Sequence, residues 1–170
     1  LKSGDILWTS TNSFVASANC GLYCRAEIDF IDINPSNGLI DIRFLKNKLV
    51  QAKKENRLPK IIIPVHFAGA SCDMESIFSL SKEYGFQIIE DASHAIGGKY
   101  NGEFVGNCKY SSITIFSFHP VKIITTGEGG CATTNDENLA KKMNSLRNHG
   151  ITKTSSEFKL IPKGEWSYEQ

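Results

Sequence analysis

The stretch Phe116-Ser117-Phe118-His119-Pro120-Val121-Lys122 decides how the fold is interpreted, together with Thr126-Gly127-Glu128-Gly129-Gly130 just after it. Residues 113–118 are β-branched and aromatic and predict a buried strand, and Pro120 ends it because proline cannot donate a ladder hydrogen bond. The glycines permit a sharp turn and close backbone approach, after which residues 131–134 can resume as a strand. Lys122 is therefore held on a loop between two strands, although most lysines are simply solvated surface residues.

Composition places the chain among ordinary globular proteins. Its 170 residues are 41% hydrophobic and 22% charged, which is enough for one core, so we expect one domain or part of one. The net charge of +1 arises from 19 basic and 18 acidic residues without a basic stripe, so we expect neither nucleic acid nor an anionic membrane as a partner. No apolar run reaches the ~18 residues needed to span a bilayer, and residues 1–5 lack signal-peptide character. A cytoplasmic location is the expectation.

The cysteines favour neither a disulfide framework nor a metal site. They are odd in number and show no C-x-x-C spacing. Cys20 and Cys24 would share a helix face, but no second ligand pair accompanies them, so we expect small buried side chains rather than zinc ligands. Reduced thiols fit a cytosolic protein.

Strand and helix patterns alternate along the chain. Asp41 and Asp73 are expected to open helices, Gly85 to end the second of these, and Asn101-Gly102 to form a hairpin turn. The polar run 9–13 is expected to cap a helix that begins near Phe14. Strands are predicted at 5–8, 28–33, 60–65, 86–91, 113–118 and 131–134, and the remaining helices at 41–56, 73–85 and 135–150.

This alternation predicts an α/β fold with a doubly wound, mostly parallel sheet, whose ligands bind at the carboxyl ends of the strands. The polar loop tips are expected to gather there, at residues 11–14, His66, 91–94 and 117–122. After Gly150 the periodicity stops, and residues 151–170, with Trp166 and Tyr168, read as a loop or an interface arm.

Three features share one explanation, which is pyridoxal phosphate. The aldehyde of this cofactor needs a lysine, its pyridine nitrogen needs a carboxylate, and its phosphate needs hydroxyl and N–H donors. Lys122, Asp91 and Ser117 supply these groups, and Phe14 offers an aromatic face. Each has an ordinary alternative when taken alone, since Asp91 could cap a segment, Ser117 could be a core hydroxyl and Phe14 could be core.

The motifs resemble those of the DegT/DnrJ/EryC1/StrS sugar aminotransferases, a family of fold-type I pyridoxal phosphate enzymes. The matching segments are 89–95 (Ile-Glu-Asp-Ala-Ser-His-Ala), Gly106, 116–122 and 126–130. The resemblance implies that Lys122 forms the Schiff base and shuttles protons, that Asp91 pairs with the pyridine nitrogen, and that Ser117 binds the phosphate. It also places His94 beside the phenolic edge and Phe14 over the ring.

The sequence leaves the roles of three histidines open. His94 alone could be a satisfied structural histidine. His66 and His119 could face substrate or could hydrogen-bond a neighbouring loop.

Segments 64–69, 71–75 and 146–150 look most like the family members of pseudaminic acid biosynthesis. The resemblance implies conversion of a nucleotide-linked 4-keto-6-deoxy sugar to its 4-amino sugar with glutamate as donor, for surface polysaccharide or nonulosonic acid biosynthesis. It also implies a homodimer. A pyridoxamine phosphate-dependent sugar dehydratase is the alternative, but those relatives carry histidine where Lys122 stands.

The resemblance covers the central part of the large, cofactor-binding domain of a family member. Measured against the family, we expect residues 1–170 to lack an N-terminal phosphate-binding segment and a small C-terminal domain. A catalytically incomplete fragment is therefore a third interpretation, and we expect the isolated 170-residue chain to be inactive.

Overall fold

The computed structural model describes residues 1–152. The chain divides into two compact units, 1–133 and 134–170. The first unit contains every strand that lies within residues 1–152, and the second contains helix α4 (Glu137–Arg147), whose first turn is capped by Asp136. From residue 153 on, the expected loop or interface arm lies outside the described residues.

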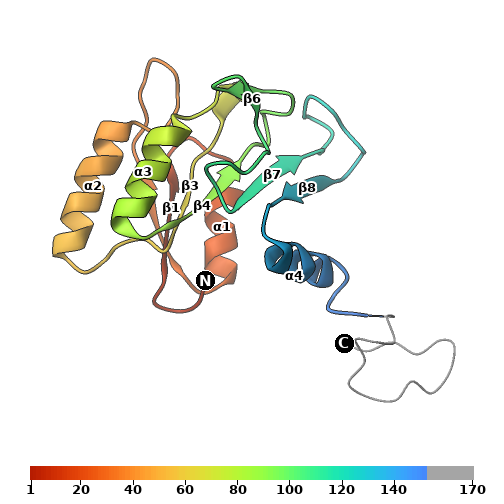
Figure 1. The fold of residues 1–170 in the computed structure, drawn as a ribbon, viewed down its shortest axis with the longest axis horizontal. Helices are drawn as coiled ribbons and strands as arrows, with labels where there is room; N and C mark the ends of the chain where they lie inside the picture. The colour runs from red at the N-terminus through yellow and green to blue at the C-terminus, as the bar shows by residue number, and fades with distance from the viewer. Residues whose placement is uncertain (153–170) are drawn as a thin grey trace, which may run out of the picture. The chain divides into compact units, whose positions relative to one another are not determined.

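A six-stranded sheet forms the centre of the first unit, in the order β2-β1-β3-β4-β7-β8 (Figure 1). Within this sheet β2, β1, β3, β4 and β7 pair in parallel, and β8 alone is antiparallel, against β7. The strands are β1 (Ile6–Ser10), β2 (Glu27–Ile31), β3 (Ile61–Ile63), β4 (Gln87–Asp91), β7 (Ile113–Ser117) and β8 (Gly130–Thr133). The mostly parallel sheet predicted from the sequence is confirmed.

Helices cover both faces of the sheet. Helices α2 (Ile42–Lys54) and α3 (Met74–Tyr84) lie side by side on one face, over a core that includes Trp8 and Ile62 (Figure 1). Helix α1 (Ala16–Tyr23) packs on the other face against β1 and β2. Because β2 and β3 pair with opposite edges of β1, the chain changes direction at β1, and open α/β sheets bind ligands beside such a point.

Side-chain caps begin helices α2 and α3, as the sequence predicts. The Asp41 carboxylate accepts hydrogen bonds from two backbone amides of the first turn of α2, and the Asp73 carboxylate accepts one from Ser76 in α3. Gly85 ends α3 with left-handed backbone. The expected hairpin is also present, as β5 (Lys99–Tyr100) and β6 (Glu103–Phe104).

The polar run 9–13 does not cap α1. Thr9 and Ser10 belong to β1, because both continue its parallel pairing with β2 and are buried. The N-cap position of α1 is Val15, whose side chain makes no capping hydrogen bond.

The expectation of buried cysteines in α1 is also wrong. Cys20 and Cys24 are exposed, because the short helix turns its Ser17–Gly21 face to the sheet. Cys131 is exposed as well, and no two of the five cysteines, all of which lie within residues 1–152, form a disulfide.

Candidate active site

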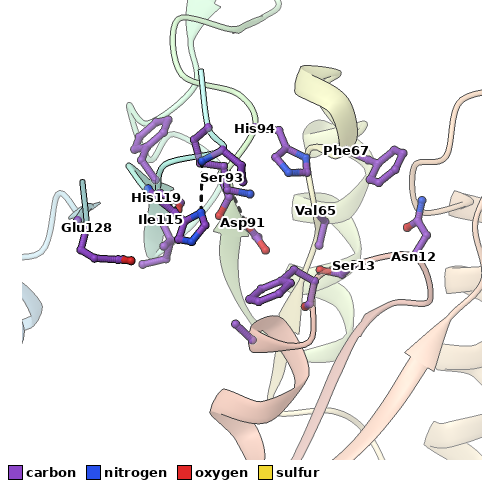
Figure 2. A pocket seen from close by; sticks show the side chains of 17 residues that line it. Asn12, Ser13, Val65, Phe67, Asp91, Ser93, His94, Ile115, His119 and Glu128 are labelled. Atoms are coloured by element: carbon purple, nitrogen blue, oxygen red, sulfur yellow. Dashed lines mark hydrogen bonds between the residues drawn. The ribbon is translucent and has the colours of Figure 1, made fainter. Parts of the chain in front are cut away.

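A cavity of about 490 Å³ opens at the carboxyl ends of β1, β3, β4 and β7 (Figure 2). All five predicted site residues line it: Phe14, Asp91, His94, Ser117 and Lys122. They are spread over more than 100 positions of sequence, and the sheet brings them together because parallel strands end at the same edge. The structure therefore confirms that they share one cavity, whereas their roles toward a cofactor remain predictions.

Lys122 lies half-buried on the loop between β7 and β8. Its backbone amide donates to the His119 carbonyl at 2.9 Å, and the loop is closed at its base by the hydrogen bond from Phe118 N to Gly129 O at 2.8 Å. Within residues 1–152 the Lys122 ammonium has no hydrogen-bond or ion-pair partner. An amine that borders a cavity without a partner is available to a ligand.

Gly130 explains why the loop returns so tightly. A Cβ built at this position would lie 2.7 Å from the Phe116 carbonyl oxygen, closer than real Cβ contacts. Glycine thus permits β8 to pair directly with β7 and so to bring the loop of Lys122 back over the cavity.

Asp91 ends β4, and its carboxylate faces the cavity (Figure 2). Oδ2 accepts a hydrogen bond from the Ser17 hydroxyl at 2.5 Å, and Oδ1 accepts one from the Ser93 amide at 3.1 Å. A carboxylate offers about four acceptor positions, so Asp91 retains capacity for another donor. It does not merely cap the segment that follows.

His94 and Phe14 both line this cavity. The short 3-10 helix η1 (Phe67–Gly69) holds His94, because the Ala68 amide donates to His94 Nδ1 at 3.3 Å and the Phe67 ring packs edge-on at 6.1 Å. Since Nδ1 accepts, the proton of a neutral ring is on Nε2. Phe14 is 73% exposed and so is not a core residue.

Ser117 and His119 extend the polar wall beyond β7. The Ser117 hydroxyl oxygen accepts a weak hydrogen bond from the His119 amide at 3.4 Å, which leaves its own hydrogen to donate. His119 is exposed and lines the cavity, and its Nδ1 accepts from the Val121 amide at 3.4 Å. Of the two histidines left open by the sequence, His119 is thus at the site.

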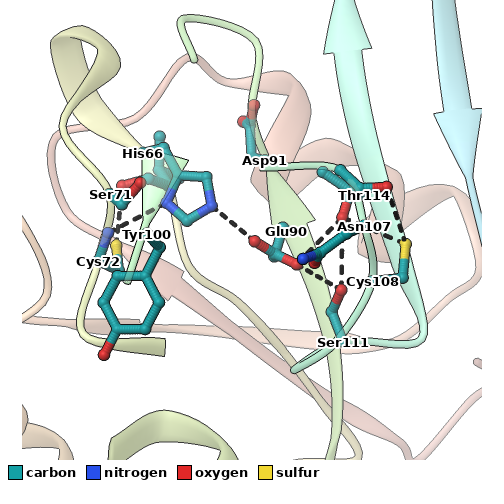
Figure 3. Close-up of polar contacts among 12 residues, drawn as sticks. His66, Ser71, Cys72, Glu90, Asp91, Tyr100, Asn107, Cys108, Ser111 and Thr114 are labelled. Atoms are coloured by element: carbon teal, nitrogen blue, oxygen red, sulfur yellow. Dashed lines mark hydrogen bonds and ion pairs between the residues drawn. The ribbon is translucent and has the colours of Figure 1, made fainter. Parts of the chain in front are cut away.

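His66 lies elsewhere, fully buried in a polar network (Figure 3). Its Nδ1 accepts from the Cys72 amide at 3.1 Å, so Nε2 carries the proton and donates to Glu90 Oε2 at 2.8 Å. The other oxygen of Glu90 accepts from Ser111 at 2.5 Å and Thr114 at 3.0 Å. Of the two alternatives that the sequence left open for His66, the structure thus shows the hydrogen bond to a neighbouring loop, whereas the adjacent Val65 and Phe67 line the cavity.

The network keeps Glu90 ionised. Burial acts to raise the pKa of this carboxyl, but the hydrogen bonds from His66, Ser111 and Thr114 outweigh burial, so the pKa lies below its ordinary value. Three side chains from the loop of His66 and from the region of β7 thus donate to this one buried carboxylate.

Four further polar residues line the cavity: Asn12, Ser13, Ser93 and Glu128. The sequence placed the first three within the polar loop tips without naming them as site residues, and it pointed neither to Glu128 nor to Ser17, which donates to Asp91. The four-residue spacing of Ser13 and Ser17 places two hydroxyls on one side of the entry to α1, and this spacing is the signal that could have revealed them. Their hydroxyls are hydrogen-bonded at 2.9 Å.

Two kinds of feature are absent from residues 1–152. Within residues 1–152, no group of three or more histidine, cysteine, aspartate and glutamate side chains is placed to hold a metal ion. No helix in that range combines the length and apolar character that crossing a membrane requires.

Comparison with known proteins agrees with these observations. Residues 1–161 match the model of the DegT/DnrJ/EryC1/StrS aminotransferase family. A Campylobacter jejuni protein named UDP-4-amino-4,6-dideoxy-N-acetyl-beta-L-altrosamine transaminase is 44% identical over 148 residues, covering 87% of this chain and 38% of that protein.

Solved structures show the same fold. Helicobacter pylori PseC, an aminotransferase involved in the biosynthesis of pseudoaminic acid, superposes with a TM-score of 0.80 at 35% identity, over 95% of this chain and 42% of that one. Bacillus subtilis NtdA, solved with its cofactor PMP bound, gives a TM-score of 0.76 at 32% identity, over 95% of this chain and 34% of that one. The chain thus spans well under half the length of these relatives. With most of its length matched, the chain belongs to the DegT/DnrJ/EryC1/StrS aminotransferase family.

Proposed function

We propose that the full-length protein containing this chain is a pyridoxal phosphate-dependent sugar aminotransferase. The proposed reaction converts the keto group of a nucleotide-linked 4-keto-6-deoxy sugar to an amine, with glutamate as the amino donor. The observation that carries the proposal is the meeting of Lys122, Asp91 and Ser117 in one cavity. The names of the Campylobacter and Helicobacter relatives support the sugar assignment, and the PMP-bound relative supports the cofactor.

The described residues fit the cofactor chemically. Lys122 offers an unpartnered amine, Asp91 a carboxylate with spare acceptor capacity, and Ser117 a hydroxyl hydrogen for a phosphate oxygen. Phe14 has an exposed ring that can stack on a flat heterocycle, and His94 presents a polar edge beside it. Pyridoxal phosphate would supply an aldehyde for the amine and a ring that delocalises the electrons released at the reacting carbon.

Each side chain then has a distinct task. Asp91 would accept the hydrogen of the pyridine nitrogen, and such an ion pair favours the protonated ring in a partly desolvated site. Lys122 would hold the cofactor through its amine and, once released by an incoming amine, would carry at Nζ the proton that the reacting carbon of the substrate loses or gains. Ser117 would hold the phosphate in place, so that the reacting groups stay aligned.

The test uses the absorbance of the purified full-length protein with pyridoxal phosphate, before and after glutamate. We expect a cofactor band that glutamate shifts, and we expect borohydride reduction followed by peptide mapping to find the cofactor on Lys122. Lys122→Ala should abolish turnover without unfolding the protein. Lys99→Ala, a change on the hairpin outside the cavity, should leave turnover unchanged. Recovery of the cofactor on a different lysine would refute the assignment.

We propose, in addition, that two copies of the full-length protein form a homodimer. Large apolar side chains are exposed on α1 and on the loop of Lys122, notably Tyr23 at 82% and Val121 at 79%. Covering such side chains removes apolar surface from water and favours association. Analytical ultracentrifugation should give twice the monomer mass, and a monomer at micromolar concentration would contradict the proposal.

A further inference from the structure

Ser17 touches Asp91 directly, although 74 residues separate them in sequence. It lies in the first turn of α1, with only 6% of its surface exposed, so its contacts are made within the protein. Its hydroxyl lies 2.5 Å from Asp91 Oδ2. A hydroxyl at this distance from a carboxylate is a short, charge-assisted hydrogen bond.

The direction of this hydrogen bond follows from the chemistry of its partners. An ionised carboxylate only accepts, so the single hydrogen of Ser17 must point to Asp91. Ser13 Oγ, at 2.9 Å, is then the donor to Ser17 Oγ. Donors arranged in series polarise one another, which strengthens the last hydrogen bond, the one to Asp91.

Two donors from different elements fix the carboxylate. Ser17 holds Oδ2 from α1, while the Ser93 amide holds Oδ1 from the loop after β4. The backbone of Asp91 is fixed too, since its amide donates to the Pro64 carbonyl and its carbonyl accepts from the His66 amide, both at 2.9 Å. With one protein donor on each oxygen, the rotation of the carboxylate is restricted and its free acceptor positions face the cavity.

We infer that Ser17 is a positioning residue, which orients the Asp91 carboxylate toward the ring nitrogen of the cofactor. The inference rests on the proposed function, because it assigns Asp91 a pyridine ring as its partner. Removing the Ser17 hydroxyl leaves Asp91 with one donor, and the carboxylate becomes free to turn away. Affinity for pyridoxal phosphate should fall about tenfold in Ser17→Ala, as expected for loss of a hydrogen bond to a charged group.

The test compares two cofactor probes on the cofactor-free full-length protein. The first is pyridoxal phosphate, and the second is its 1-deaza analogue, in which a C–H replaces the ring nitrogen and cannot pair with Asp91. Binding of each is followed by absorbance for wild type and Ser17→Ala. Ser79→Ala, the same change at an exposed serine of α3, is the matched control.

We expect Ser17→Ala to weaken the binding of pyridoxal phosphate about tenfold and to leave the binding of the 1-deaza analogue unchanged. The control variant Ser79→Ala should bind both probes as the wild type does. Equal weakening of both probes would overturn the inference, because Ser17 would then support the cavity in general. Unchanged binding of pyridoxal phosphate in Ser17→Ala would overturn it as well, while leaving the proposed function intact. Failure of the wild-type protein to bind pyridoxal phosphate would overturn both.

Discussion

Glu90 and Asp91 are consecutive carboxylates on β4, yet they belong to different environments because strand side chains alternate between faces. Glu90 turns to the α2 and α3 face, is 5% exposed, and accepts hydrogen bonds from three side chains. Asp91 turns to the cavity, is partly exposed, and accepts two hydrogen bonds. In Figure 3 the Asp91 side chain points away from the Glu90 network.

The difference in surroundings gives Glu90 a structural role and leaves Asp91 accessible to a ligand. Glu90 is buried, accepts from three protein donors and does not line the cavity, so it ties β4 to β7 and to the loop of His66 and lies away from a cavity ligand. Asp91 is held by fewer donors and keeps acceptor capacity on its open side. A substitution at Glu90 should therefore act on stability, and one at Asp91 on chemistry.

Glu90→Ala should give the largest effect of the three changes proposed here. It leaves the buried hydrogen of His66 and two hydroxyls without their acceptor, and breaking a buried charged network in this way costs about 3 kcal/mol of unfolding free energy or more. Urea unfolding of the full-length protein measures the loss. Glu103→Ala is the matched control, since Glu103 pairs with Lys109 at half-exposed positions and should cost under ~1 kcal/mol. Similar losses at the two positions would contradict the anchor role.

Asp91→Asn should show the opposite profile. The amide keeps the shape but removes the charge that favours a protonated ring nitrogen, so kcat/KM should fall by about 30-fold or more, equivalent to ~2 kcal/mol of transition-state stabilisation. Unfolding free energy should fall by less than in Glu90→Ala, because the Asn side chain keeps one acceptor oxygen for either Ser17 or the Ser93 amide. Steady-state assays with keto sugar and glutamate measure the rate, with Asp29→Asn on exposed β2 as the control. A wild-type kcat/KM in Asp91→Asn would refute the proposed role of Asp91 toward the ring nitrogen.

Local chemistry explains why much of the fold was predictable. Asp41, Asp73 and Asp136 cap their helices by contacts within three residues, and the Asn101-Gly102 turn is equally local. The shared cavity of Lys122 and the other predicted residues followed from a general rule, because the carboxyl ends of parallel strands meet at one edge.

What the sequence did not reveal depends on contacts between distant segments. His66 follows a strand that ends at the cavity edge, so its sequence position alone does not show where its imidazole points. Only the contact with Glu90, 24 residues further on, shows that the ring points into the interior. Ser17 likewise appears as an ordinary helix serine until Asp91 is placed beside it. Pairing with β2 and β3 makes the start of the polar run 9–13 part of strand β1 and not a helix cap, and local capping preferences do not include such pairing.

The smallest of the three effects concerns acid pH and tests whether Glu90 works as a charged acceptor. The folded-state pKa of Glu90 is lowered, so its ionised form contributes stability above the unfolded-state pKa of about 4.5, and this contribution is lost as pH falls through the folded-state pKa. Glu90→Gln removes the titration while nearly keeping the shape. The difference in unfolding free energy between wild type and Glu90→Gln should be constant at pH 6–8 and should shift against wild type below about pH 4.5. Because other carboxyls titrate equally in both proteins, the difference isolates Glu90. Two stability curves that stay parallel down to pH 3 would show that the charge of Glu90 is not what its donors stabilise.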